Sequence, residues 1–368
     1  MDKRTFIKCG LLGTGSLMCF PAMGLPGRDD LWKWSKEALF YEVTPRGVKC
    51  MICPNECTLK PDELSDCRNR INKNNKLYTI AYGNPCAVHV DPIEKKPLYH
   101  FLPTSNAFSV ATAGCNLACL NCQNWTISQS SPTETQNYDL MPESLVANTI
   151  KYDCRSIAYT YSEPITFFEY TYDSAMLARE KGIKNVLVTA GYINEEPLRY
   201  FLKNIDAANV DLKSFSESIY LKLNAGKLAP VLKTLQVMKE EGVWLEITNL
   251  IVPSWTDDMA MIREMCKWLY DNGFEDNPLH FSRFHPMHKL TQLPSTPIST
   301  LEEARKIARS EGLKFVYIGN VPGTKASNTY CPGCDKLLIE RLGYTITQNH
   351  VVGGKCKFCG EKIAGVWE

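Results

Sequence analysis

The feature that most constrains the fold is a regular alternation of strand-like and helix-like segments through the middle of this 368-residue chain. Apolar, strand-like runs occur at residues 107–113, 156–161, 184–189, 208–212, 243–252, 279–284 and 313–318. Helical spacing separates them at residues 143–153, 166–181, 195–203, 228–241, 257–272 and 301–310. Repeated strand–helix units with short connections predict a parallel sheet with right-handed crossovers. About six units predict an α/β fold of the partial (β/α)6, TIM-like barrel type, not a full eight-unit barrel.

Cys115, Cys119 and Cys122 follow the first predicted strand with the spacing C-x3-C-x2-C. Three thiolates do not close a tetrahedral zinc site, which needs a fourth ligand. On a four-iron cluster, three cysteines leave one iron open to bind a small molecule. The alternative is a zinc knuckle, or three cysteines that are neighbours by chance. The spacing favours a [4Fe-4S] cluster at the carboxyl end of a strand, where barrel enzymes keep their chemistry.

Two further cysteine groups flank the predicted barrel. The C-terminal group consists of two C-x2-C pairs, Cys331 with Cys334 and Cys356 with Cys359. Two such pairs separated by a hairpin-sized span predict a structural metal site, with zinc as the default and a rubredoxin-like iron or a cluster as alternatives. The N-terminal group is less regular: Cys50, Cys53, Cys57 and Cys67. It either binds zinc or an accessory cluster, or consists of four reduced thiols in a compact flap.

These groups predict four parts: a signal-like segment at 1–30, a cysteine-rich flap at 31–104, the barrel at 105–322 and a zinc-ribbon-like module at 323–368. The chain begins with Lys3-Arg4, an apolar stretch at 9–20 and Pro21-Ala-Met-Gly24, a pattern similar to a twin-arginine export signal. The apolar stretch is shorter than the ~20 residues of a membrane-spanning helix. We expect either export or a cytoplasmic location, the latter favoured by the need for a low-potential reductant.

The overall composition argues against two classes of protein. The net charge is +1 and no long basic run is visible, so nucleic acid is not an expected partner. Sixteen cysteines in a chain this long, many in C-x2-C pairs, indicate metal or cluster ligation in place of a disulfide scaffold.

Polar side chains recur at the ends of the later predicted strands. They are Glu163, Thr189, Asp211, Lys213, Thr248, Asn249, His280 and Arg283. Each has a structural alternative: Glu163 as a helix N-cap, Asp211 and Lys213 as a mutual pair, His280 as a core histidine. Because the strand ends of a barrel share one face, we expect a cofactor site here, with six ligands: Glu163, Thr189, Asp211, Lys213, Asn249 and His280.

Several stretches resemble the radical SAM superfamily, in the branch that includes pyruvate formate-lyase activating enzyme. More narrowly, the chain resembles the AmmeMemoRadiSam-system radical SAM enzymes. The resemblance runs from about residue 37 to the C-terminus. It is carried by residues 38–41, 53–54, 91–103 (DPIEKKPLYHFLP), 114–125, 161–164 (YSEP), 210–213 (VDLK), 280–284 (HFSRF), 330–334 and 365–367.

The resemblance implies roles for particular residues. The triad of Cys115, Cys119 and Cys122 would hold the cluster, whose open iron is chelated by S-adenosylmethionine (SAM). Glu163 would lie by the SAM ammonium group, the pair Asp211 and Lys213 would bind its ammonium and carboxylate, and His280 would lie near the nucleoside. One residue departs from the pattern: Asn121 stands where an aromatic side chain usually precedes the third cysteine, with Trp125 as a substitute.

The resemblance further implies reductive cleavage of SAM to a 5′-deoxyadenosyl radical, which removes a hydrogen atom from a protein or small-molecule substrate. It implies a low-potential electron donor, and Memo-like and AMMECR-type proteins as companions. The alternative from another class is a metal-binding scaffold or electron carrier without SAM chemistry. The Asn121 departure favours this alternative, while Glu163, Asp211 and Lys213 argue against it, since a carrier needs no SAM site.

Overall fold

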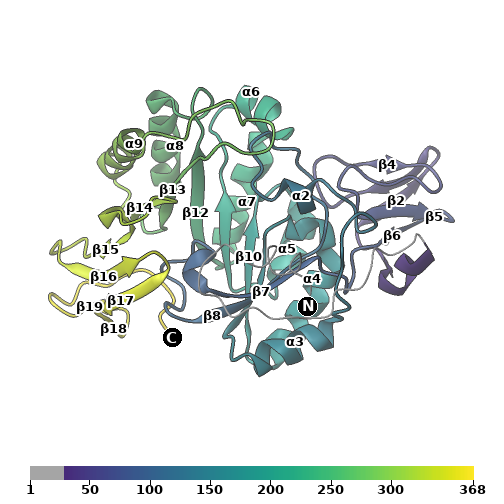
Figure 1. Ribbon diagram of the computed structural model, residues 1–368, viewed down its shortest axis with the longest axis horizontal. Helices are drawn as coiled ribbons and strands as arrows, with labels where there is room; N and C mark the ends of the chain where they lie inside the picture. The colour runs from purple at the N-terminus through teal and green to yellow at the C-terminus, as the bar shows by residue number, and fades with distance from the viewer. Residues whose placement is uncertain (1–28) are drawn as a thin grey trace, which may run out of the picture.

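The computed structural model describes residues 29–368. Figure 1 shows a small β-rich N-terminal region at one end, an α/β body in the middle and a small β-rich C-terminal region at the other end. The predicted signal-like segment, 1–30, lies outside the described residues except for its last two positions. Within the described part of the chain, no helix is both long enough and apolar enough to cross a bilayer.

The body is built on one eight-stranded sheet with the order β14-β13-β12-β11-β10-β9-β8-β7. Its strands are β7 (Ala87–Pro92), β8 (Asn106–Ala111), β9 (Ser156–Tyr159), β10 (Lys184–Thr189), β11 (Ala207–Asp211), β12 (Trp244–Ile251), β13 (Leu279–Arg283) and β14 (Val316–Gly319). The strands from β8 to β14 are parallel, and β7 pairs antiparallel with β8. Because β7 and β14 are separate edges, the sheet is an incomplete barrel, as predicted.

Helices follow each strand from β8 to β13, which confirms the six predicted units. They are α2 (Trp125–Ser128), α3 (Pro142–Lys151), η3 (Pro164–Phe167), α4 (Phe168–Glu180), α5 (Glu195–Leu202), α6 (Glu217–Ile219), the π-helical turn η4 (Tyr220–Asn224), α7 (Leu228–Glu240), α8 (Met259–Asp271) and α9 (Ile298–Ser310). Strand β7 was not predicted. It ends in Pro92, which an edge strand tolerates because it need not donate to a neighbour there.

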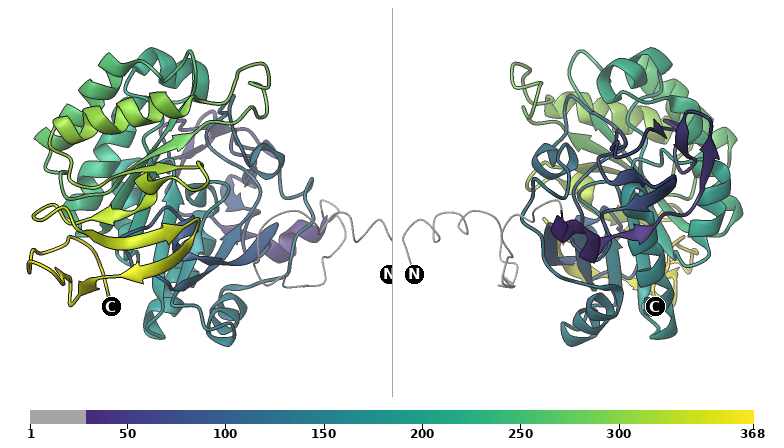
Figure 2. Two further views of the ribbon diagram at one scale, coloured as in Figure 1. Left: turned by 60° about the vertical axis from the view of Figure 1, so that its left-hand side comes forward. Right: turned by 90° about the vertical axis from the view of Figure 1, so that its right-hand side faces the viewer.

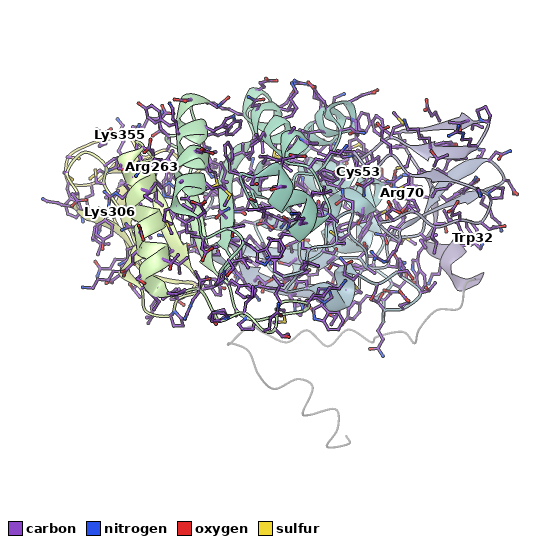
Figure 3. The ribbon with its side chains drawn as sticks, turned by 90° about the horizontal axis from the view of Figure 1, so that it is seen from above. Trp32, Cys53, Arg70, Arg263, Lys306 and Lys355 are labelled. Carbon is purple, nitrogen blue, oxygen red and sulfur yellow. The ribbon has the colours of Figure 1, made fainter. Side chains whose placement is uncertain are left out.

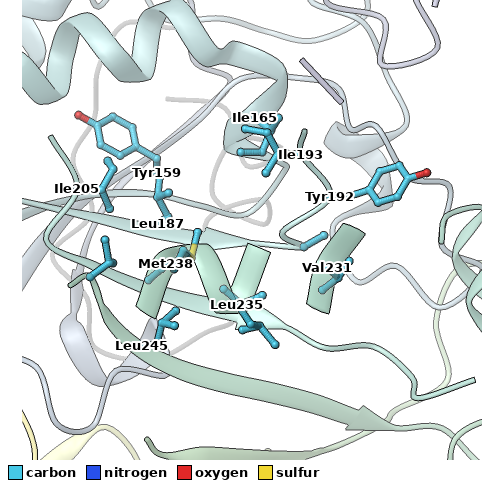
Figure 4. Close-up of a cluster of buried hydrophobic side chains, with 14 of the residues drawn as sticks. Tyr159, Ile165, Leu187, Tyr192, Ile193, Ile205, Val231, Leu235, Met238 and Leu245 are labelled. Carbon is cyan, nitrogen blue, oxygen red and sulfur yellow. The ribbon is translucent and has the colours of Figure 1, made fainter. Parts of the chain in front are cut away.

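The outer face of the sheet packs against these helices. In Figure 4, Val231, Leu235 and Met238 of α7 lie over Leu187 of β10 and Leu245 of β12. Their spacing of i, i+4 and i+7 places the three α7 side chains on one helix face, and all are buried. Burying each such side chain stabilises the fold by roughly 1.5–3 kcal/mol.

The inner face of the sheet is lined by small side chains. Ala107 of β8, Ala158 of β9 and Ala207 of β11 pack against a segment that crosses the barrel interior. This segment contains the short helix η2 (Ile93–Lys95) and places Leu98 and Phe101 in the same buried cluster. The alanines leave the space that the segment fills, because a protein interior is packed without large voids.

Short strands form the terminal regions, shown from two sides in Figure 2. The N-terminal region contains η1 (Asp29–Trp34) and two sheets, β1 (Lys36–Glu37) with β6 (Lys76–Thr79) and β5 (Arg70–Lys73), and β2 (Tyr41–Thr44) with β3 (Gly47–Cys50) and β4 (Thr58–Leu59). The C-terminal region contains η5 (Lys325–Ser327), the sheet of β15 (Thr329–Tyr330), β16 (Leu337–Leu342) and β17 (Thr345–Asn349), and the pair β18 (Val351–Val352) and β19 (Lys355–Cys356).

The C-terminal region is anchored to the segment inside the barrel. His100 Nδ1 donates to the Ala364 carbonyl at 2.7 Å, and the Leu102 N–H donates to the Val366 carbonyl at 2.7 Å. The buried Arg341 guanidinium donates to the Tyr99 carbonyl at 3.0 Å and lies over the Tyr99 ring. The segment inside the barrel and the C-terminal region therefore pack against each other.

Candidate active site

A cavity of about 600 Å³ opens where the parallel strands end. Its lining includes Cys115, Cys119, Cys122, Glu163, Thr189, Asp211, Lys213 and His280. These side chains come from loops and strands spread over 166 positions of sequence, from 115 to 280 counted inclusively. The fold therefore brings together the three cysteines and five of the six polar residues singled out as cofactor ligands in the sequence.

The loop with the three cysteines is fixed by a neighbouring π-helical turn. The Ala118 N–H donates to the Asn224 carbonyl at 3.0 Å, and the Leu120 N–H donates to the Leu223 carbonyl at 2.8 Å. The Asn224 amide also donates to Cys119 Sγ at 3.2 Å. Single π-helical turns are frequent at functional sites. Here the turn η4 aims a donor at a sulfur atom, which holds the orientation of Cys119.

Burial controls the ionisation of these cysteines. It raises the pKa of the Cys115 thiol well above its usual value, and the nearby Glu163 carboxylate acts in the same direction. Burial also raises the pKa of Cys119, although the positive charge of Lys213 opposes the shift. A metal ligand must be a thiolate, so metal binding here releases protons.

Glu163 follows β9 and is buried at 2% exposure. Its carboxylate accepts hydrogen bonds from Thr189 Oγ1 at 2.6 Å, from the Ala190 N–H at 2.8 Å and from the Ile165 N–H at 3.3 Å. The last of these makes Glu163 the N-cap of η3, so the structural alternative is realised. Burial raises the pKa of Glu163, while the three donors oppose the shift. Glu163 also lines the cavity beside Cys115.

Asp211 ends β11, and Lys213 follows two residues later. Lys213 Nζ lies 2.8 Å from Asp211 Oδ2, so the mutual pair considered in the sequence is present. Both side chains line the cavity and keep part of their surface open, 22% for Lys213 and 36% for Asp211. Burial disfavours the charged ammonium, but Asp211 together with Cys119 and Tyr220 raises the pKa of Lys213 above its usual value. A cation and an anion therefore stand side by side at the cavity wall.

His280 forms a buried pair with a residue that sequence reasoning missed. Its Nε2 atom lies 2.7 Å from Glu246 Oε2, and both side chains are buried. The Glu246 carboxylate also accepts from the N–H groups of Tyr99 and His100, at 2.9 and 2.7 Å. Although burial disfavours the carboxylate, its hydrogen bond with His280 lowers the pKa of Glu246. His280 is thus a hydrogen-bonded core histidine whose ring reaches the cavity.

Asn249 is the one predicted ligand that the fold does not bring to the cavity. It lies in β12, where successive side chains point to opposite faces of the sheet. Thr248 and Leu250 line the cavity, while Asn249 donates to the Leu212 carbonyl at 2.7 Å. The register pairs Thr248 with Asp211 and with His280 on the two adjacent strands. The sequence named both Thr248 and Asn249 at this strand, and the register assigns Thr248 to the cavity face.

A second polar group on the cavity side was not assigned in the sequence. Lys96 Nζ lies 2.6 Å from Asp91 Oδ2, and the Tyr161 hydroxyl donates to the same carboxylate. Lys96 Nζ also lies 4.4 Å from the centroid of the Tyr161 ring. Burial lowers the pKa of Lys96 to about 8, against the attraction of Asp91. Tyr161 has a φ of +65°, a strained conformation that is common at functional sites. The sequence did contain a pattern that could have identified this group, because Asp91 and Lys96 lie in the 91–103 block and Tyr161 lies in the YSEP motif.

The cavity wall carries polar atoms that fit a bound polar cofactor. Asn121 Oδ1 and Thr248 Oγ1 are buried, have no hydrogen-bond partner and belong to residues that line the cavity. Leaving a buried polar atom unpaired costs about 1–3 kcal/mol, which a polar ligand would remove. Trp125 is 41% exposed, stacks on His288 and is not among the lining residues. Asn121 itself thus occupies the place of the usual aromatic side chain.

The C-terminal cysteines form a compact tetrad. The Sγ atoms of Cys331, Cys334, Cys356 and Cys359 all lie within 4.8 Å of one another. Cys331 Sγ lies 3.6 Å from Cys359 Sγ, and Cys334 Sγ lies 3.8 Å from Cys356 Sγ. Four sulfur atoms at ~2.3 Å from one zinc ion stand roughly 3.8 Å apart. The chain therefore contains a site with four cysteines in the geometry of a single tetrahedral ion.

The sequence comparison agrees with this architecture. Residues 109–269 match the Radical SAM superfamily. The chain is also 48% identical over 331 residues to an uncharacterized protein of Methanocaldococcus jannaschii, covering 89% of this chain and 98% of that protein. This chain belongs to the radical SAM superfamily. The family uses a [4Fe-4S] cluster and SAM and acts on peptide or small-molecule substrates, so the protein is an enzyme of the radical SAM class.

The solved structures that are similar to parts of this chain include the following three. A domain of pyruvate-formate lyase-activating enzyme from Bacteroides vulgatus has a TM-score of 0.39 and 15% identity, over 45% of this chain and 99% of that one. A radical SAM methyltransferase from Sphaerobacter thermophilus has a TM-score of 0.47 and 12% identity, over 59% and 67%. SuiB of Streptococcus suis, bound to S-adenosylmethionine, has a TM-score of 0.47 and 11% identity, over 66% and 56%.

Proposed function

We propose that this enzyme holds a [4Fe-4S] cluster on Cys115, Cys119 and Cys122, cleaves SAM reductively and abstracts a hydrogen atom from a carbon of its substrate. The observation that carries the proposal is that these three thiols share one cavity with Glu163, Asp211 and Lys213. A cluster bound by three cysteines supplies an open iron for SAM and the one electron that cleaves it. The low-potential donor of that electron is a partner of the reaction.

Different polar residues of the cavity bind different groups of SAM. Lys213 binds the SAM carboxylate, because an ammonium group and a carboxylate form a charge-assisted hydrogen bond. Asp211 and Glu163 accept from the SAM ammonium group, and His280 lies toward the nucleoside. Thr189 acts through Glu163, to whose carboxylate it donates at 2.6 Å. Asn121 and Thr248 offer their unpaired oxygen atoms to the adenine or ribose. Asn249 supports the loop after β11 through the Leu212 carbonyl.

The substrate binds on the side of the cavity formed by Tyr99, Lys96 and Tyr161. These residues line the cavity and belong to the segment inside the barrel and to the loop after β9. Lys96 and Tyr161 converge on Asp91, which fixes their positions and keeps the ammonium charged beside the ring. The substrate is a protein backbone or a small molecule.

The 91–103 block and the C-terminal cysteine pairs support membership of the AmmeMemoRadiSam group, with Memo-like and AMMECR-type proteins as companions. For the C-terminal tetrad we propose zinc, since its four sulfur atoms leave no open position for substrate. The tetrad then has a structural role: it stabilises the C-terminal region, whose Arg341 side chain donates a hydrogen bond to the Tyr99 carbonyl.

The test is anaerobic reconstitution with iron and sulfide, followed by SAM and dithionite, with 5′-deoxyadenosine and methionine measured as products. We expect both products in equal amounts from the wild-type enzyme and none from the variant that lacks all three cysteines of the loop. A metal-binding scaffold or electron carrier would take up iron and cleave no SAM. That result would replace the proposed function by this alternative.

A further inference from the structure

The four N-terminal cysteines surround one small buried cavity. Cys50 ends β3, Cys53 and Cys57 lie between β3 and β4, and Cys67 lies in the turn before β5. The cavity is lined by these four residues together with Arg70, Asn116 and Thr166. Cys50 and Cys67 are buried and the other two are half-buried. Four soft sulfur donors that converge on an enclosed space form a metal-type site separate from the large cavity.

One nitrogen atom of a buried arginine in this cavity lacks a hydrogen-bond acceptor. Arg70 is 1% exposed, and its Nη2 atom donates to both oxygen atoms of Glu169, at 2.8 and 3.0 Å. Its Nη1 atom is buried and has no hydrogen-bond acceptor. Figure 3 labels Arg70 and Cys53 in the same part of the molecule, where the N-terminal region meets the body. A buried charged donor without an acceptor is costly. An anionic, sulfur-rich group in the cavity would satisfy it.

The spacing of the four sulfur atoms differs from that of the C-terminal tetrad. Among the described residues, the C-terminal tetrad alone brings three or more Cys, His, Asp or Glu ligand atoms within 4.8 Å of one another. The N-terminal sulfur atoms are therefore spread more widely around their cavity than one tetrahedral ion requires. Four cysteines around a wider centre match a cluster of four irons, in which each cysteine binds a different iron.

This cavity lies against the loop that carries the other cysteine triad. Asn116 lines the small cavity, whereas its neighbours Cys115 and Leu117 line the large one. The Asn55 amide donates to the Asn116 carbonyl at 2.9 Å. Gly114 has a φ of +95°, and a Cβ atom there would lie 2.4 Å from the Cys67 carbonyl oxygen. The two cysteine groups thus lie on opposite sides of one tightly packed loop.

We propose that Cys50, Cys53, Cys57 and Cys67 bind a second [4Fe-4S] cluster, with Nη1 of Arg70 as its hydrogen-bond donor. All four irons then carry a cysteine, so this cluster has no open iron and does not bind SAM. Its role is electron transfer, and this part rests on the proposed function. It accepts one electron from a low-potential one-electron donor and passes one to the cluster on Cys115, Cys119 and Cys122, so its own oxidation state is restored.

The binding itself is tested without turnover. The variant Cys115→Ala/Cys119→Ala/Cys122→Ala is reconstituted anaerobically with iron and sulfide. We expect about four iron and four sulfide ions per chain to remain, and about eight of each in the wild type. Reduction by dithionite should give an electron paramagnetic resonance signal in this variant. Adding Cys53→Ala and Cys67→Ala should remove the remaining iron, whereas adding Cys154→Ala, a buried cysteine outside the three groups, should leave it.

The outcomes separate this proposal from the function. About four irons in the wild type and none in the triad variant would overturn it, as would zinc without sulfide in the N-terminal cavity. The wild-type count needs no substitution, so misfolding of a variant cannot decide the result. A triad variant with a full second cluster, from a wild type that does not cleave SAM, would uphold the second site and overturn the proposed function alone.

Discussion

Lys213 Nζ and Asp211 Oδ2 are 2.8 Å apart at the rim of a cavity that also contains Cys119. A pair of this kind, partly open to solvent, contributes little to stability, ~0–1 kcal/mol. The position of the pair in the cavity matters more for function than its contribution to stability. The cation and the anion match the carboxylate and ammonium groups of an amino acid, and SAM carries both. The pair can therefore exchange its internal contact for two contacts with SAM.

Replacing Lys213 by Ala should weaken SAM binding about ten-fold or more, because a charge-assisted hydrogen bond contributes roughly 1.5–3 kcal/mol. The iron content should not change, since no thiolate is removed. SAM affinity and iron content of the reconstituted variant are the measurements. Lys184→Ala is the matched control, because Lys184 pairs with Asp206 at 3.0 Å at the opposite end of the strands. If Lys213→Ala binds SAM as tightly as the wild type does, the lysine pairs only with Asp211 and does not bind SAM.

Replacing Cys119 by Ala should abolish SAM cleavage and lower the iron content by about four per chain, because two cysteines hold a cluster poorly. The visible absorbance should fall in parallel. Cys86→Ala, at a cysteine outside the three groups, should retain both properties. If Cys119→Ala cleaves SAM as fast as the wild type does, Cys119 is not a cluster ligand.

Replacing Cys334 by Ser should remove one metal ion from the C-terminal tetrad and loosen the region around β16. A structural zinc site adds its binding free energy to folding, so its loss should be felt locally. Metal analysis is best done in the variant that lacks Cys115, Cys119 and Cys122, where zinc should still be present. Hydrogen exchange of the β16 amides should then rise on replacement of Cys334. A metal-free tetrad with protected β16 amides under reducing conditions would show that the region folds without metal.

His100 should make the protein sensitive to acid. Its ring is fully buried, with Nδ1 donating to the Ala364 carbonyl and Nε2 2.6 Å from the Tyr317 hydroxyl. Burial lowers the pKa of His100 to about 4. The unfolded chain therefore binds more protons between about pH 6.5 and pH 4, and stability is lost as the pH falls through that range.

The matching experiment compares urea unfolding of the wild type and of His100→Asn, which cannot titrate, at pH 7 and pH 4.5. The free energy of unfolding should fall by about 2 kcal/mol more in the wild type than in the variant. Equal losses in the two proteins would mean that other groups cause the acid sensitivity.

The sequence predicted the parallel body because each of its elements carries a local pattern. Most strands from β8 to β14 contain short apolar runs, such as Val186-Leu187-Val188 in β10 and Val316-Tyr317-Ile318 in β14, which is usual for strands buried on both faces. The helices between them are amphipathic: their apolar residues recur on one helix face, as Val231, Leu235 and Met238 of α7 illustrate. The cysteine spacings are local as well, and the C-terminal tetrad has the compact geometry expected of it.

The sequence pattern did not predict the features that depend on distant pairing. Strand β7 adds to the sheet only because Ala87–Pro92 finds the open edge of β8. Asn249 and Thr248 are adjacent, and only the register with Asp211 shows that Thr248 faces the cavity. His280 was recognised, but its partner Glu246 was not, because 34 positions separate them.

By itself, the sequence determined the order of strands and helices in the parallel body and the cysteine groups, since short-range periodicity and spacing encode these. The superfamily was indicated by the resemblance of its motifs. Tertiary structure decided which polar groups meet. Arg70 and Glu169 are 99 positions apart, and so are brought together only by packing of the N-terminal region on the barrel. Asp91, Lys96 and Tyr161 meet because small alanines let a segment enter the barrel. Contacts of this kind depend on the volume and register of many residues at once, and no local pattern contains that information.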